Sequence, residues 1–508
     1  MGRARGAGGH DRISELPDPI LGHILSLMPA KAATQTTILS RRWKHLWEYI
    51  WCSATTLDFA AEFAARQTPG DFVRNVNRYL KLHRGKKIQR FLVSFPAVDC
   101  FFPDVEKWVE FAVAKDVEEL WLEFSSQGQE TYFCGDFENW VCGFRVPHQL
   151  FDCLPLRVLG LSNCGLSPSP GFPGLLSLRS LSLTRVDVTT DMLHRILSEC
   201  RHLERLLLRD CVHFNSLKLT SPCIKLKQLV LVDCWELFNL EISAPSLLSF
   251  HFFGEIYFEN SFSDLTGLAD AFICSIDRTS WQPHQNYIKL LSDVAHVEIL
   301  TVCTATLACV TIWSDYLPDA VPIPLQNLRE LQLVMDHMSL DYLSYIYGFF
   351  ELCPSPLLEK LFVRLPENTE DSYAIVATIE QPPDVHFNRL RVIKMHSFKG
   401  TKCEMKLVRF LLEKTPALET LVLVAPPKPS AGEGIIGDGQ GGRSPGLKFM
   451  EEMDMRIQQG QVLALPRVSG AVQIVVCEYL EDDTKLRATH NEQTCEWMEF
   501  FRTHVDVE

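Results

Sequence analysis

A leucine pattern that recurs along the middle of the chain constrains the fold more than any other feature. Four segments share the arrangement L-x-x-L-x-L and begin at Leu156, Leu178, Leu203 and Leu226, in steps of 22, 25 and 23 residues. A unit of this length cannot bury its apolar side alone and does so only by stacking on its neighbours. The sequence therefore predicts an elongated array of repeats.

The repeat also predicts the secondary structure of each unit. Leu-x-Leu is a short strand with both leucines pointing inward, and a cysteine follows three residues after the last leucine in three of the four units, as is typical of leucine-rich repeats. The predicted fold class is α/β, an irregular leucine-rich-repeat solenoid or horseshoe with a parallel concave sheet and helices or loops outside. Residues 190–200 are expected to form one outer helix. Looser copies begin at Val117, Leu247, Val297, Leu328, Leu358, Leu390 and Leu418.

The cysteines indicate the compartment. There are 17, an odd number, with no CxxC pair and no N-x-[ST] acceptor site, and the N-terminus lacks the apolar segment of a signal peptide. We interpret the chain as intracellular, in the cytoplasm or nucleus, with reduced thiols. Cys164, Cys211 and Cys234 close repeats and are expected to be structural. A zinc site from Cys134, Cys142, His148 and Cys153 lacks paired near ligands, so no metal is predicted.

Several function classes are disfavoured. The formal net charge of −14 argues against a broad nucleic-acid surface, and the longest uncharged run, residues 299–313, is too short to cross a bilayer. Hydrolase, zinc-protease, P-loop and EF-hand motifs are missing from the sequence. GEGIIG at 432–437 matches G-x-G-x-x-G, but PPKPS and DGQGGRSPG flank it, so we expect a surface loop. Neither a cofactor nor a catalytic residue is predicted.

The N-terminal segment has a different pattern. Asp18 and Pro19 begin a helix, in which Ile20 and Ile24 form one apolar row and Leu21 and Leu25 the next. Pro29 stops it, Ser40 can cap another helix, and Trp43, Leu46, Trp47 and Ile50 then follow helical spacing. Such a unit is too small to bury its apolar side chains by itself. It therefore packs on the rest of the chain or on a partner.

These residues resemble an F-box, in order and at the spacing of that family. The resemblance implies a three-helix F-box that binds a Skp-type adaptor and, through it, a cullin–RING ubiquitin ligase. Many relatives have an aliphatic and then a basic residue where this chain has Thr34 and Gln35, a departure that bears on adaptor affinity. Some of the matching residues must instead hold the module together. The residues carried over as adaptor contacts are Leu16, Pro17, Ile20, Leu21, Ile24, Leu25, Met28, Pro29, Leu39 and Trp43.

Residues 390–423 are expected to form a strand, a loop, an amphipathic helix that Pro416 ends, and a strand. This region resembles the FBD region of plant F-box/leucine-rich-repeat proteins, which brings no chemistry with it. The predicted division of the chain is a disordered N-terminus 1–10, the F-box 11–55, the solenoid 100–380, FBD-like repeats 384–425, a flexible loop 426–446, and a last element with an exposed tail 447–508.

The leading hypothesis is a non-catalytic, substrate-recognition subunit of a Skp–cullin–F-box ubiquitin ligase, whose repeats bind a protein target. A scaffold or binding protein that acts without the ligase is the alternative. Residues beside the strand leucines should face the concave surface, where Lys394 and His396 join five candidate target contacts. A local basic patch for an acidic or phosphorylated segment and an ordinary solvated sheet both remain open. The five candidates are Trp121, Arg205, Arg209, Lys360 and Arg364.

Overall fold

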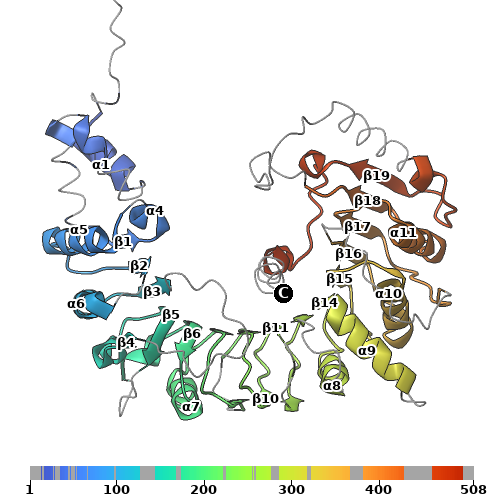
Figure 1. The fold of residues 1–508 in the computed structure, drawn as a ribbon, viewed down its shortest axis with the longest axis horizontal. Coiled ribbons are helices and arrows are strands. Elements are labelled where there is room, and N and C mark those ends of the chain that lie inside the picture. The colour runs from blue at the N-terminus through green and yellow to red at the C-terminus, as the bar shows by residue number, and fades with distance from the viewer. Residues whose placement is uncertain are drawn as a thin grey trace, which may run out of the picture. The chain divides into compact units, whose positions relative to one another are not determined.

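We describe the chain from a computed structural model, which divides into two compact units, residues 1–226 and 227–508 (Figure 1). The predicted N-terminus 1–10, Pro29, Cys134, Cys142, the GEGIIG run and most of the 426–446 loop lie outside the described residues. The structure describes residues 13, 16–26, 28, 35–39, 41–43, 46, 52, 54–65, 67–96, 99–125, 143–166, 173–220, 225–254, 256, 259–275, 285–316, 322–366, 382–427 and 460–495.

Unit 1 begins with a helical module. Helix α1 (Asp18–Ser26) is followed by the 3₁₀ turn η1 (Thr36–Ile38) and by helical residues 41–43. Leu21, Leu25 and Trp43 are buried together, and Leu16, Met28 and Leu46 pack against them. One apolar row of α1 thus forms the core of this module, as its helical spacing requires.

The rest of unit 1 is a parallel ladder in which each strand pairs with the next, β1-β2-β3-β5-β6-β7. Its strand leucines are buried, and helices follow several strands. The strands are β1 (Thr56–Phe59), β2 (Arg90–Pro96), β3 (Glu119–Ser125), β4 (Arg145–Val146, paired with β5), β5 (Val158–Leu166), β6 (Ser180–Asp187), β7 (Arg205–Arg209) and β8 (Ser216–Leu219). The helices and 3₁₀ turns are α4 (Ala61–Ala64), α5 (Pro69–Leu82), η2 (Asp99–Phe101), α6 (Phe102–Ala114), η4 (His148–Asp152), η5 (Pro173–Ser177) and α7 (Thr190–Glu199).

Unit 2 carries a second parallel ladder, β9-β11-β13-β14-β15-β16-β17-β18-β19, with β10 paired to β12 beside it. The strands are β9 (Gln228–Val232), β10 (Asn239–Ser243), β11 (Ser249–Phe253), β12 (Glu259–Ser263), β13 (Asp270–Cys274), β14 (Ile299–Cys303), β15 (Glu330–Val334), β16 (Lys360–Arg364), β17 (Val392–His396), β18 (Thr420–Val424) and β19 (Gln473–Cys477). The helices are α8 (Gln285–Asp293), α9 (Thr304–Tyr316), α10 (Leu340–Leu352), α11 (Lys402–Lys414) and the 3₁₀ turn η6 (Tyr479–Glu481).

A left-handed backbone position explains the closing position of the repeat. Asn163, Asp210 and Asp233 have positive φ values of 53°, 49° and 52°. Asparagine and aspartate tolerate this left-handed conformation better than most residues, and each stands directly before a closing cysteine. Those cysteines are buried, and burial raises the pKa of the Cys211 thiol to about 12. They act as small apolar side chains, in agreement with the structural role expected of them.

The predicted parallel strands are confirmed, including every looser copy from Val117 to Leu418, and so are α7 and the strand–helix–strand order of 390–423. In α11, Leu407, Phe410 and Leu411 face inward, and a capping box of Thr401 and Glu404 begins the helix. The pattern missed β1, β2, β13 and β19 of the ladders and the strands β4, β8, β10 and β12. In β2 and β13, Phe91 and Ala271 stand at the second leucine position, so a search for leucine overlooks them.

The end of the chain differs from the expected exposed tail. After β19, residues 482–495, here called the C-terminal segment, lie against the strands of unit 2 (Figure 1, red). His490 and Thr494 are only 3% and 6% exposed. Side chains from strands far earlier in the chain bury these residues, which no local pattern encodes.

Candidate functional site

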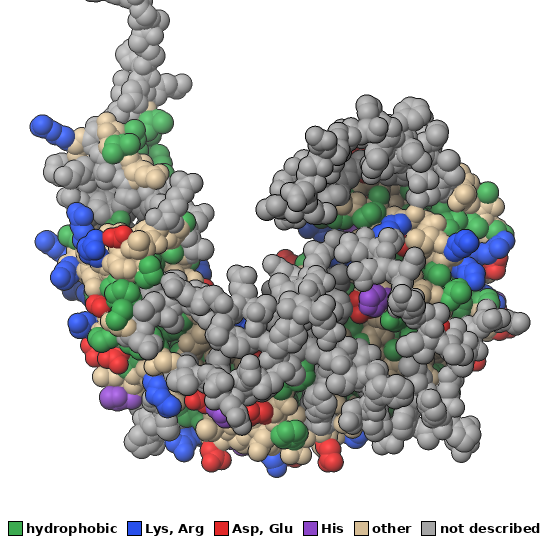
Figure 2. All heavy atoms as spheres, in the orientation of Figure 1, with side chains coloured by type: hydrophobic (Ala, Val, Ile, Leu, Met, Phe, Trp, Pro, Cys, Tyr) green, Lys and Arg blue, Asp and Glu red, His purple; other side chains and the backbone are tan. Residues whose placement is uncertain are grey.

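The helical module separates its apolar residues into two groups. Leu21, Leu25 and Trp43 form its core, whereas Ile20 and Ile24 on the neighbouring row of α1 are 49% and 36% exposed. Figure 2 shows hydrophobic side chains gathered on this module. Exposed apolar side chains on so small a module are typical of a docking surface. The docking ridge, as we call it, comprises Pro17, Ile20, Ile24, Ile38 and Leu39.

The structure therefore sorts the predicted adaptor contacts. Leu39 is 64% exposed and belongs to the ridge, and Pro17 is exposed as well. Leu16 and Met28 pack on the core. Sequence reasoning left Ile38 out of the predicted contacts, although it is 85% exposed beside Leu39. The apolar pair Ile38-Leu39 was the available signal.

Arg42 fixes the module from within the chain. Its Nε and Nη2 atoms donate to Asp18 Oδ1 at 2.8 and 2.5 Å, and Nη2 also donates to the carbonyl of Leu16 at 2.6 Å. The guanidinium therefore ties helical residues 41–43 to the start of α1. Asp18, placed in the first turn of α1, also complements the helix dipole.

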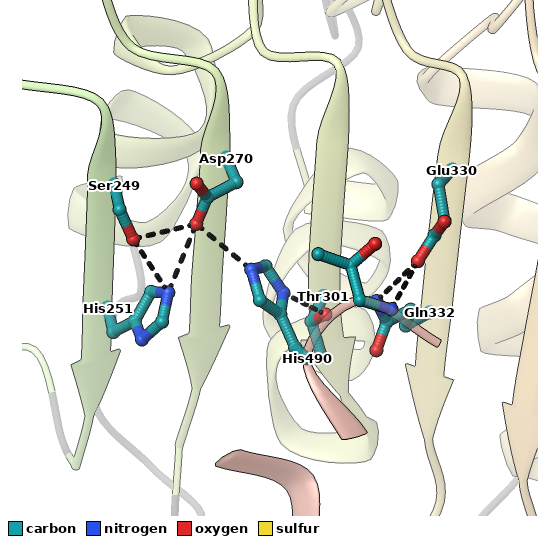
Figure 3. A network of polar contacts seen from close by, with 8 residues as sticks. Ser249, His251, Asp270, Thr301, Glu330, Gln332 and His490 are labelled. Atoms are coloured by element: carbon teal, nitrogen blue, oxygen red, sulfur yellow. Dashed lines mark hydrogen bonds and ion pairs between the residues drawn. The ribbon is translucent and has the colours of Figure 1, made fainter. Parts of the chain in front are cut away.

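A second candidate site lies on unit 2. Residues at alternate strand positions form what we call the polar strand face, and their neighbours across the ladder follow from the strand register. Figure 3 shows the central part of this face with His490 of the C-terminal segment on it. Its members are Ser249, His251, Asp270, Thr301, Glu330, Gln332, Lys360 and Lys394.

Asp270 is the centre of this network (Figure 3). Its Oδ1 atom lies 3.1 Å from His251 Nε2, 2.9 Å from His490 Nε2 and 2.8 Å from the Ser249 hydroxyl that donates to it. Burial alone would raise the pKa of Asp270, but the hydrogen bonds from both histidines and the serine outweigh it and lower that pKa. The carboxylate is thus held ionised by three donors.

Lys394 forms the other end of the network. This lysine is 2% exposed, and its Nζ donates to Asp482 Oδ2 at 2.5 Å, to Thr484 Oγ1 at 3.0 Å and to the carbonyl of Leu486 at 2.8 Å. All three N–H donors of the ammonium are satisfied by the C-terminal segment. Between the two ends, the backbone N–H of Thr489 donates to Glu330 Oε1 at 2.7 Å.

The arrangement does not form a working hydrolase triad. Asp270, His490 and Thr301 occur in the order of an acyl-transfer relay, with Thr301 Oγ1 2.8 Å from His490 Nδ1. Thr301 has no exposed surface, and lifting the C-terminal segment to reach its hydroxyl would remove His490. Ser249 and Asp270 both approach the same nitrogen of His251, so this histidine cannot relay a proton between them.

Among the described residues, His251, Asp270 and His490 form a group that could hold a metal ion, with ligand atoms within 4.8 Å of one another. Tetrahedral zinc with bonds of ~2.1 Å keeps its ligand atoms roughly 3.4 Å apart. Both histidine nitrogens lie closer than this to Asp270, at hydrogen-bond distance. The geometry therefore fits a hydrogen-bonded clasp better than a metal centre.

The five predicted target contacts lie in different environments. In unit 1, Arg205 is exposed, Arg209 is half-buried, and the ring of half-buried Trp121 packs directly on Gly160. In unit 2, Lys360 is half-exposed with its Nζ 3.6 Å from Glu330 Oε2, and Arg364 Nη1 donates to Cys495 Sγ at 3.3 Å.

The two residues expected beside them are also engaged. Lys394 is covered by the C-terminal segment rather than exposed. Burial lowers the pKa of His396 to about 4, with Lys394 and Arg364 adding to the shift and Asp482 opposing it. The basic residues of this face therefore lie beside groups of the same unit.

Comparison with known proteins decides the family. A model described as "At1g61320/AtMIF1, LRR domain" matches residues 79–431, and the F-box domain model matches residues 13–52. The chain belongs to the plant F-box/leucine-rich-repeat family with an FBD region. The F-box model covers the N-terminal helical module, and the repeat-domain model covers the ladders from β2 to β18.

Two similar Arabidopsis thaliana proteins cover nearly the whole chain. The F-box/FBD/LRR-repeat protein At1g13570 is 26% identical over 81% of this chain and 91% of its own length. The F-box/FBD/LRR-repeat protein At1g78750 is 25% identical over 93% of this chain and 98% of its own length. Within the part of the chain that the structure describes, no helix has the length and apolar character needed to cross a membrane.

Proposed function

We propose that this F-box protein is the substrate-recognition subunit of a Skp–cullin–F-box ubiquitin ligase in the cytoplasm or nucleus. Its N-terminal module binds the Skp-type adaptor, its repeats bind a target protein, and other subunits carry out the chemistry. The contribution of this chain to the reaction is proximity, because it holds a target lysine near the ubiquitin carrier. It needs no cofactor for that role.

One observation carries the proposal. The two apolar rows of α1 have opposite surroundings, with Leu21 and Leu25 buried in the module and Ile20 and Ile24 exposed. The first row suffices to hold the module together, so the second is available to a partner. Exposed apolar surface of this kind stabilises a complex by roughly 25 cal/mol for each Å² that the partner buries.

The test uses a matched pair of exposed leucines. Leu39 on the docking ridge and Leu154 outside the module are 64% and 60% exposed, so neither substitution removes a core side chain. Leu39→Asp should weaken capture of the purified Skp-type adaptor by a factor of about thirty, equivalent to ~2 kcal/mol. Leu154→Asp should leave capture unchanged. Equal capture by both variants would exclude the ridge as the adaptor contact.

Direct measurement on the natural chain separates the two leading functions. If the protein binds a target but captures no adaptor at micromolar concentration, the alternative of a scaffold that acts without the ligase is correct. Gln35 is exposed just before the docking ridge and stands where many relatives have a basic residue. It is therefore the first position at which to restore that basic residue and measure adaptor capture again.

A further inference from the structure

The C-terminal segment crosses the strands of unit 2 instead of extending the sheet. Asp482 contacts Lys394 on β17, and His490 contacts Asp270 on β13. These strands are separated by four strand spacings, roughly 19 Å in total. The eight residues from Asp482 to His490 can span at most about 28 Å. The segment is therefore long enough to cross from β17 past β16, β15 and β14 to β13.

The polar strand face holds this segment with polar side chains that are buried while the segment is in place. Lys394, 2% exposed, supplies three donors to it, and Glu330, 4% exposed, accepts a backbone N–H from it. At the far end, the His490 ring packs against His251 and Phe272, with ring centroids 4.9 and 5.7 Å away. The buried Lys394 at one end and the partly buried Asp270 at the other select a carboxylate and a donor group at a fixed separation.

The segment can leave without breaking the ladder. Strands β13 to β17 pair with one another along their whole length. Among the described residues, the hydrogen bonds between this segment and the sheet are made by strand side chains. The connection to β19 passes through Tyr479 and Leu480, which are 50% and 93% exposed and so anchor it little. Removing the segment would uncover polar groups that water can hydrate, together with the side of the Phe272 ring that His490 contacts.

We propose that the polar strand face is the target-docking surface of this protein and that the C-terminal segment occupies it until a target displaces it. A displacing target presents a carboxylate to Lys394 and, about eight residues later, an imidazole or ammonium group to Asp270. This inference rests on the proposed function, because it assumes that the repeats bind a protein. Under this proposal, the C-terminal segment presents the same groups to the polar strand face as the target does.

The first experiment uses the natural full-length chain. Hydrogen exchange should show residues 482–495 opening at least tenfold more often than β14 and β15 beneath them, because the segment detaches while the ladder stays paired. Exchange of the segment only together with these strands would make it a permanent part of the fold and overturn the proposal.

The second experiment adds a fluorescent peptide of residues 480–495 to the full-length protein. The double variant Asp482→Asn, His490→Ala, whose own segment is weakened, should bind the peptide at least tenfold more tightly than the natural chain does. Folding of the variant is checked by its adaptor capture and by circular dichroism. Equal binding by both proteins would contradict displacement.

Changes in the peptide test the chemistry without disturbing the protein. Peptides with Asp482→Asn or His490→Ala should each bind the double variant at least tenfold more weakly. Asp483 is exposed and is the matched control, so Asp483→Asn should bind as the unchanged peptide does. Equal binding by all four peptides would show that the two selected groups are not recognised.

Two further outcomes are distinguishable. If EDTA treatment of the natural chain removes bound zinc and thereby frees the segment, His490 belongs to a metal clamp, and the displacement proposal is wrong. If the adaptor is never captured while the peptide results hold, the ligase function fails and the docking surface stands. If the peptide results fail while adaptor capture holds, only the inference about this surface is lost.

Discussion

The strand faces of the two units differ although the same leucine register builds both. In unit 1, Ser182 on β6 and Leu207 on β7 stand between buried leucines and keep part of their surface exposed. In unit 2, the equivalent Thr301, Gln332 and Lys394 are 0%, 3% and 2% exposed. The repeat determines which residues point to this face. Residues from elsewhere in the chain determine whether the face is open.

This difference predicts that removing one acid costs much more stability in unit 2 than in unit 1. Asp482→Ala leaves the buried Lys394 ammonium without its charged partner and should lower the opening free energy of residues 482–495 by about 3 kcal/mol. Glu204→Ala removes the partner of the largely exposed Arg179 and should cost under ~1 kcal/mol. Hydrogen exchange measures both, in the C-terminal segment and in β7. Similar small costs would mean that water reaches Lys394 in the natural chain.

Acid should destabilise unit 2 through His396. Its folded pKa of about 4 lies below the ordinary histidine value, so the unfolded chain takes up a proton first as the pH falls. The contribution of His396 to the free energy of unfolding is about 3 kcal/mol above pH ~6.5 and is lost as the pH falls from about 6.5 to 4. Denaturant midpoints measured across this range should flatten in His396→Asn. The exposed His386 is the control, and His386→Asn should retain the natural slope.

The close packing of Trp121 on Gly160 in unit 1 can be tested by adding one methyl group. A Cβ at Gly160 would overlap the Trp121 ring, which packs on this glycine across β3 and β5. Gly160→Ala should therefore destabilise unit 1 by about 2 kcal/mol through overpacking. Gly470 has no atom within 4 Å of an added Cβ, so Gly470→Ala should leave the unfolding midpoint unchanged. A neutral Gly160→Ala would show that Trp121 can move freely from this position.

The accuracy of the sequence predictions follows how local each feature is. Leu181 and Leu183 determine a strand by themselves, so the ladder and α7 could be predicted from spacing alone. The docking ridge required knowledge of which row of α1 meets Trp43, and the sequence permits either row. The sequence predicted an exposed Lys394, and this prediction was wrong. Its partner Asp482 is 88 residues away and belongs to no repeat, so no local pattern indicates the contact.

The same distance along the chain has a consequence for synthesis. Strands of the ladder pair with near neighbours, but His490 reaches Asp270 across 220 residues. At about 5–20 residues per second, a ribosome needs roughly 10 to 40 s to make that intervening length. During this interval Asp270, and later Lys394, have already been made, but the C-terminal segment that contacts them has not. Every newly made molecule therefore passes through a period in which this surface is open, and the chain can close it only after residues 482–495 have been made.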